Sequence, residues 1–242
     1  MPYSKPFPRI FLPQKNKSIM GADVFSSHPA YIDPKEATSL INSARIIIKD
    51  YKDLIDYIEP TNDNELVYSH RIYELLLRTA TEFEANCKGI LLANGYAKRH
   101  FNIEDYYKLN KLMKLDKYEL TTQLWSPEKT FCPLSEWSTG HSLKWYRAYN
   151  NVKHNRYTNF YEATLENLFN GLCCLVTILA AQIPQCIGYL DGSGLIMTAD
   201  NDNEIIINNF TIKYPLFADA DKYEFDWGTL KNDLQPFDLY AF

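Results

Sequence analysis

Residues 145–156 carry the side-chain types that acid–base chemistry on a phosphodiester requires. A helix turns about 100° per residue, so Arg147 and His154, seven positions apart, lie within about 20° of each other. Asn151 falls about 40° to one side of Arg147, and Asn150 about 60° to the other. The segment therefore predicts a helix face that presents a guanidinium, two amides and an imidazole together.

The opposite face of this helix is apolar and can dock into a core. It carries Trp145, Tyr149 and Val152. On the polar face, histidine can transfer protons near neutral pH, and arginine offers a fixed pair of N–H donors to a phosphate and its transition state. Lys153 and Arg156 add positive charge for a nucleic-acid backbone. This set of groups needs no metal ion, so the expected chemistry uses neither metal nor cofactor.

Two interpretations of these patterns stay open. A polar helix face is often simply solvated, and a histidine near a helix end often caps carbonyl groups. An earlier stripe, Arg71, Glu74, Arg78 and Glu82, has the spacing of ion pairs on one helix face. That stripe is either a salt-bridged surface or, through Arg78 and Glu82, a second wall of a nucleic-acid cleft.

Helices are the elements expected to position these residues. Asp33 followed by Pro34 predicts a helix start, and Pro60 ends that helix. Three- and four-residue apolar spacing predicts further helices at residues 65–93, after Asn102, at 141–153 and at 160–182. Asn159 and Glu162 have the spacing of a capping box for the last of these helices.

The remaining segments divide the chain. Residues 1–33 read as an extended arm, residues 34–183 as a helical bundle, and residues 184–242 as a small antiparallel β element with a tail. Residues 114–138 are expected to be an irregular connection, because they contain Pro127 and Pro133 without clear periodicity. Short strands are expected at the following ranges: 186–190, 195–198, 204–208 and 211–214. The predicted fold class is mainly α.

Composition narrows the functional classes. The net charge is −5, so any nucleic-acid contact must come from a local basic patch. Five cysteines occur without metal-ligand spacing, which indicates reduced thiols and a cytoplasmic location. The chain starts without the apolar region of a signal peptide, and the apolar stretch 171–183 is too short to span a bilayer of about 30 Å, so no membrane association is expected.

The segment Arg147-x6-His154 resembles the Arg-x(4–6)-His motif of HEPN-domain proteins. The wider run 145–156 and the amphipathic segment from Phe160 resemble bacterial HEPN-like proteins, over roughly residues 35–183. HEPN domains are antiparallel helical bundles, and many are RNases of toxin–antitoxin, abortive-infection and CRISPR systems. The resemblance implies a homodimer in which two such motifs meet in one cleft.

In these RNases the RNA 2′-hydroxyl attacks the adjacent phosphate without a metal ion. Carried over, the resemblance makes Arg147 the group that stabilises phosphate charge and His154 the group that transfers protons, with Asn150 or Asn151 supporting them. Ala148 stands where active members often carry a polar residue. The expected function is an RNA-cleaving toxin or phage-defence effector with an antitoxin or other protein partner. The alternatives are a non-catalytic HEPN module that binds RNA, nucleotide or protein, and a helical interaction protein.

Overall fold

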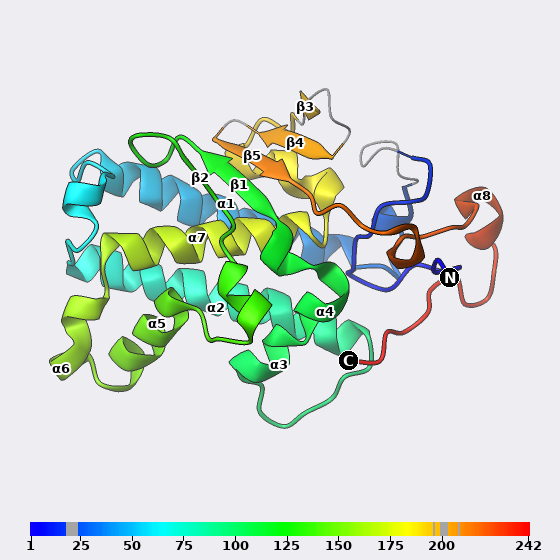
Figure 1. Ribbon diagram of the computed structural model, residues 1–242, viewed down its shortest axis with the longest axis horizontal. Coiled ribbons are helices and arrows are strands. Elements are labelled where there is room, and N and C mark those ends of the chain that lie inside the picture. The colour runs from blue at the N-terminus through cyan, green and yellow to red at the C-terminus, as the bar shows by residue number, and fades with distance from the viewer. Residues whose placement is uncertain (18–23, 196, 199–202, 208) are drawn as a thin grey trace.

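The computed structural model describes residues 1–17, 24–195, 197–198, 203–207 and 209–242. It is mainly helical, with one small antiparallel sheet, which confirms the expected mainly-α class at that level (Figure 1). Three long helices form its centre: α1 (Pro34–Ile55), α2 (His70–Ala93) and α7 (Leu165–Ala180). Each of the three packs against the other two.

The sequence accounts for where α1 and α2 begin. Asp33 accepts hydrogen bonds from the backbone N–H groups of Lys35 and Glu36, as expected for its position before Pro34. α2 begins five residues later than the expected Glu65, because the side chain of Ser69 caps it. A 3₁₀ turn (Asn62–Asn64) precedes it.

The predicted start of the last long helix is wrong. Helix α7 begins at Leu165 and not at Phe160, and its N-cap is Thr164, whose hydroxyl accepts from the backbone of Asn167. Residues Phe160–Glu162 form a separate 3₁₀ turn. The predicted capping box of Asn159 and Glu162 therefore does not form at this helix, because the chain bends between the two segments.

Helix α5 (Lys144–His154) covers most of the predicted helix 141–153. The helix expected after Asn102 is present as two short pieces, and Asn102 and Asp105 form a capping box at its start. The short helices are α3 (Ile103–Tyr107), α4 (Leu109–Met113), α6 (Arg156–Asn159) and α8 (Trp227–Leu230).

The sheet differs from the predicted one in two respects. Residues 114–138 are not merely irregular, since they supply the first two strands. Residues 186–190 are not a strand, since Pro184–Asp191 forms a 3₁₀ helix. The strands of the described residues are β1 (Glu119–Thr122), β2 (Lys129–Phe131), β3 (Met197–Thr198), β4 (Glu204–Ile207) and β5 (Phe210–Lys213). Parts of the predicted strands 195–198 and 204–208, namely residues 196 and 208, lie outside the described residues.

The strand order is β2-β1-β5-β4-β3, and every pair is antiparallel. In this register Ile212 of β5 lies between Leu120 of β1 and Ile205 of β4, and all three side chains are fully buried. The pairing of β1 with β5 joins the expected bundle, residues 34–183, to the expected C-terminal element.

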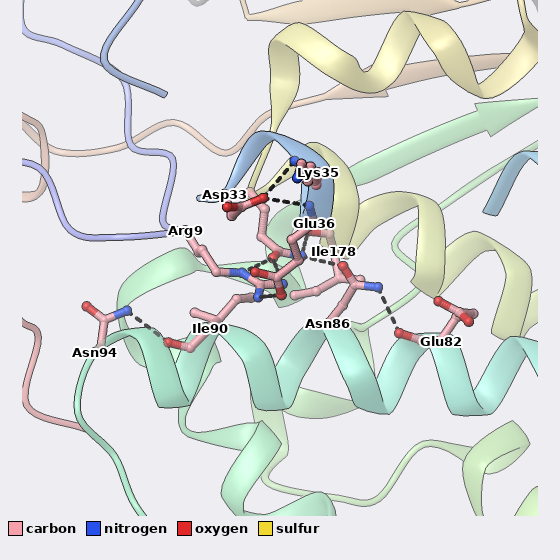
Figure 2. A network of polar contacts seen from close by, with 10 residues as sticks. Arg9, Asp33, Lys35, Glu36, Glu82, Asn86, Ile90, Asn94 and Ile178 are labelled. Atoms are coloured by element: carbon pink, nitrogen blue, oxygen red, sulfur yellow. Dashed lines mark hydrogen bonds and ion pairs between the residues drawn. The ribbon is translucent and has the colours of Figure 1, made fainter. Parts of the chain in front are cut away.

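The expected N-terminal arm is anchored by a buried arginine. Arg9 is 3% exposed and donates from Nε and Nη2 to the Gln182 side-chain oxygen at 3.1 and 2.9 Å. Its Nη1 lies 2.5 Å from a carboxylate oxygen of Glu36. Gln182 in turn donates to Asn86 of α2 at 2.9 Å, so the arm, α1 and α2 share one polar network (Figure 2).

In the part of the chain that the structure describes, no helix is both long and apolar enough to cross a membrane. The cysteine side chains are all free thiols, and Cys87, Cys173 and Cys174 are buried.

Candidate functional site

The apolar face of α5 fixes the direction of its polar face. Trp145 donates from its indole nitrogen to the sulfur of Cys174 on α7 at 3.2 Å. Tyr146 donates its hydroxyl proton to Glu84 on α2 at 2.7 Å. Burial, reinforced by this acceptor, raises the pKa of Tyr146. Because α5 is held against α2 and α7, the stripe that contains Arg147 must face outward.

Arg147 is half exposed, with 53% of its side chain accessible. Its guanidinium donates to the backbone carbonyl of Ser142, just before α5, and Nη1 lies 3.7 Å from a carboxylate oxygen of Glu136. The guanidinium is therefore directed back toward the N-terminus of α5. Its only ion pair among the described residues is long and solvated, and such pairs contribute little to stability.

His154 is the last residue of α5, and it is exposed. Among the described residues, none forms a hydrogen bond with its imidazole. Arg147 and His154 share one face of α5, as the spacing predicts, and no hydrogen bond joins their side chains in the described part of the chain. Neither side chain is buried in the helical core.

Arg147, Asn150 and Asn151 line one side of a groove with a volume of about 660 Å³. The facing wall comes from Leu66 and Tyr68 and from a second set of residues: Tyr161, Glu162, Thr164, Glu166 and Asn167. Asn151 donates to the carboxylate of Glu162 across this groove at 2.9 Å, and Asn150 donates to the carbonyl of Tyr146 in its own helix. α5, α6 and the starts of α2 and α7 lie at one end of the molecule, on the left in Figure 1.

Ala148 lines the same groove and is 4% exposed. The structure gives a physical reason for a small apolar residue here. A polar side chain at this position would be buried, and burying a polar group without a partner is unfavourable.

Lys153 and Arg156 lie outside the groove. Lys153 donates to the hydroxyl of Tyr149 at 2.8 Å, and this bond raises the pKa of Lys153. The Arg156 guanidinium carbon lies 5.7 Å from the ring centre of Tyr73 on α2, a cation–π distance. Lys153 is in the last turn of α5 and Arg156 is the first residue of α6, so both exposed cations lie close to His154 in the chain.

Arg78 and Glu82 belong to another surface, between α1 and α2. Arg78 pairs with Asp50 of α1 at 2.5 Å, and Arg71 pairs with Glu74 at 3.3 Å. Burial raises the pKa of Glu82, while a hydrogen bond with Ser43 opposes the rise. Arg78 and Glu82 line grooves with α1, and neither lines the groove beside Arg147. The structure thus does not bring them together with the Arg147 segment.

The sequence does not identify several of the groove residues as part of a functional site. They are Leu66, Tyr68, Tyr161, Glu162, Glu166 and Asn167. Of these residues, only Asn167 is recognisable in the sequence as unusual, because it is a polar residue on the buried face of an otherwise apolar helix. Glu166 lies in the first turn of α7 and the others lie just before α2 or α7, and their approach to α5 depends on the tertiary fold.

In the described part of the chain, no cluster of three or more His, Cys, Asp or Glu side chains could hold a metal ion. Comparison of the chain with models of protein families, with curated proteins and with solved structures gives no match.

Proposed function

We propose that the protein is a metal-independent endoribonuclease of the HEPN type that acts as a homodimer. One observation carries the proposal: Arg147 and His154 lie exposed on one face of α5, and that helix is fastened to the core by its other face. Exposed arginine and histidine at this spacing match the sequence motif described above.

The reaction follows from the chemistry of the two groups. The RNA 2′-oxygen attacks the adjacent phosphorus, the bond from phosphorus to the 5′-oxygen breaks, and a 2′,3′-cyclic phosphate and a 5′-hydroxyl result. His154 removes the proton from the 2′-hydroxyl, and the second His154 of the dimer protonates the leaving 5′-oxygen. Arg147 neutralises the charge that grows on the phosphate oxygens.

In the proposed dimer, Arg147 and His154 can act on one phosphate without meeting within a single chain. When two α5 helices meet across a two-fold axis, each phosphate can be reached by residues from both chains. Lys153 and Arg156 would then supply positive charge beside the cleft, and the exposed Tyr157 a ring for base stacking.

RNA cleavage in the presence of EDTA tests this function. We expect the parent protein to cleave single-stranded RNA, and Arg147→Ala and His154→Ala each to lose ~100-fold or more of that rate, as typical for loss of a proton-transfer or charge-stabilising group. Arg71→Ala and His100→Ala are matched controls, because both side chains are exposed and lie outside α5. Equal cleavage by the parent and the α5 variants would remove the nuclease assignment.

The second candidate function is a non-catalytic module that binds RNA, a nucleotide or a protein partner. Ala148 favours it, because the polar residue frequent at this place in active members is absent. RNA binding that is weakened by Arg147→Ala, with no cleavage by the parent protein, would select this candidate. We also propose that the protein acts in the cell as a toxin or phage-defence effector. An antitoxin or another protein would then be its partner.

A further inference from the structure

We propose that the groove beside Arg147 holds a guanine base of the substrate, next to the phosphate that Arg147 contacts. The inference rests on the proposed function for the choice of RNA as the polymer. Its basis is the set of hydrogen-bonding groups that the groove presents.

Backbone hydrogen bonds fix the walls of the groove, so the groove is preformed in the absence of a ligand. The backbone N–H of Leu165 donates to the carbonyl of Val67 at 2.8 Å, and that of Glu166 donates to Glu65 at 3.0 Å. These bonds hold the segment before α2 against the start of α7, opposite α5. A preformed site saves the entropy of ordering its walls on binding.

The mouth of the groove carries exposed apolar and aromatic groups. Leu66 is 68% exposed, Tyr161 59% and Tyr68 50%, and all three line the groove. Unpaired RNA bases are recognised largely by stacking on such side chains, at about 1–3 kcal/mol per base. A flat ring therefore suits this surface.

Two of the polar side chains that line the groove, Glu162 and Glu166, are carboxylates with acceptor capacity left. Glu162 uses one carboxylate oxygen for Asn151, and Glu166 uses one for Lys144 at 2.7 Å. The second oxygen of each carboxylate has no donor among the described residues. A carboxylate can accept two adjacent donors.

Asn167 adds a further acceptor. It is 6% exposed and lines the groove. Its amide nitrogen donates to the carbonyl of Glu162 at 2.8 Å, which fixes which end of the amide is oxygen. That oxygen is buried and has no hydrogen-bond partner in the described part of the chain. An unpaired buried acceptor is unfavourable, and a donor brought within reach of this oxygen would remove that penalty.

Guanine is the base that fits an acceptor-rich wall beside two cations. Its Watson–Crick edge presents two adjacent donors, the N1–H and the N2 amino group, which match one carboxylate such as Glu162. Its O6 and N7 are acceptors that suit Lys144, while Arg147 contacts the adjacent phosphate. Adenine and cytosine offer one amino group beside a ring acceptor that would face the carboxylate. Uracil offers one imino donor between two carbonyls.

Calorimetric titration with the four nucleoside 3′-monophosphates tests the base preference without requiring cleavage. We expect the guanosine nucleotide to bind ~10-fold or more tightly than the others. Glu162→Gln should remove that preference and leave the affinity for the adenosine nucleotide unchanged, because the amide replaces one acceptor with a donor. Glu74→Gln, at an exposed carboxylate 60% accessible on the groove between α1 and α2, is the control and should bind like the parent. Thermal unfolding confirms that each variant is folded.

Equal affinities for the four nucleotides, or an unchanged guanine preference in Glu162→Gln, would overturn the inference. The outcome is separable from that of the proposed function. Cleavage in EDTA with equal nucleotide affinities removes the guanine site and keeps the nuclease. Selective binding of the guanosine nucleotide without cleavage keeps the guanine site and removes the nuclease.

Discussion

Gly89 on α2 makes room for the guanidinium that anchors the N-terminal arm. A β-carbon at this position would lie 2.1 Å from Nη1 of Arg9. Arg9 cannot swing away freely, because it is buried and bonded to Glu36 and Gln182. The polar network in Figure 2 therefore depends on the absence of a side chain at one helix position.

We expect Gly89→Ala to lower the free energy of unfolding by about 1–3 kcal/mol, since overpacking outweighs the better helix propensity of alanine. Chemical denaturation measures the change. Gly228→Ala is the control, because the nearest atom to its β-carbon would be Asp226 Oδ1 at an ordinary 3.4 Å. In an Arg9→Met background the effect of Gly89→Ala should shrink, and full additivity of the two changes would contradict the account.

Asp105, at the start of α3, makes the stability of the protein depend on pH. Burial opposes its ionisation, but hydrogen bonds from Lys98, Tyr96 and the backbone of Asn102 outweigh burial and lower its pKa below the ordinary 3.8. The folded protein thus binds this proton less readily than the unfolded chain does. The stabilisation is complete above pH 3.8 and is lost as the pH falls through the lowered pKa of the folded state.

Asp105→Asn should therefore destabilise the protein by about 1–2 kcal/mol at neutral pH, from the lost charge-assisted bonds. The difference in free energy of unfolding between this variant and the parent should become smaller as the pH falls below 3.8. Denaturant unfolding at a series of pH values measures it, with Glu104→Gln, an exposed carboxylate one residue earlier, as the control. If the difference in free energy of unfolding stays constant down to the lowest pH at which the protein folds, Asp105 does not make stability depend on pH.

At the scale of single residues, the sequence predicted the shared face of Arg147 and His154 because helical geometry alone determines it. It did not predict that Arg147 reaches back to Ser142 and Glu136, or that Arg78 pairs with α1. Those contacts depend on segments that are distant in sequence. The groove residues Glu162 and Tyr161 were missed for the same reason.

At the scale of elements, the long helices were predictable because their apolar spacing continues over several turns. Strands β1 and β2 were not, because Pro127 and Pro133 lie close by and residues 114–138 show no clear periodicity. The apolar run 186–190 was misassigned because a short apolar segment does not distinguish a strand from a helical turn.

The missed strand β1 should be essential to the sheet. Leu120 is fully buried opposite Ile212 of β5, so Leu120→Ala should lower the free energy of unfolding by about 2–5 kcal/mol. Thr130→Ala removes only the exposed hydrogen bond between the hydroxyl groups of Thr130 on β2 and Thr121 on β1. This variant should change the free energy of unfolding by less than about 1 kcal/mol. Chemical denaturation of both variants gives the comparison, and similar values for the two would contradict the buried role of β1.

At the scale of the whole molecule, segments far apart in sequence are interleaved. The hydroxyl of Tyr223 donates to the carbonyl of Ile10 at 2.8 Å and accepts from the backbone of Phe7 at 3.0 Å, so the tail is bound to the arm. Pairing of β1 with β5 joins the middle of the chain to its C-terminal part. This assembly leaves the polar face of α5 and the adjoining groove accessible. Helix α5 itself lies at one end of the molecule (Figure 1).

The central claim is that this face cleaves RNA by attack of the 2′-hydroxyl. It is tested most directly by an RNA oligonucleotide in EDTA that carries a single 2′-deoxy substitution at the mapped cleavage position. The account predicts that the unmodified strand yields a 2′,3′-cyclic phosphate and a 5′-hydroxyl, and that the substituted strand is not cut at that position. Cleavage of the substituted strand there at the unmodified rate would contradict it.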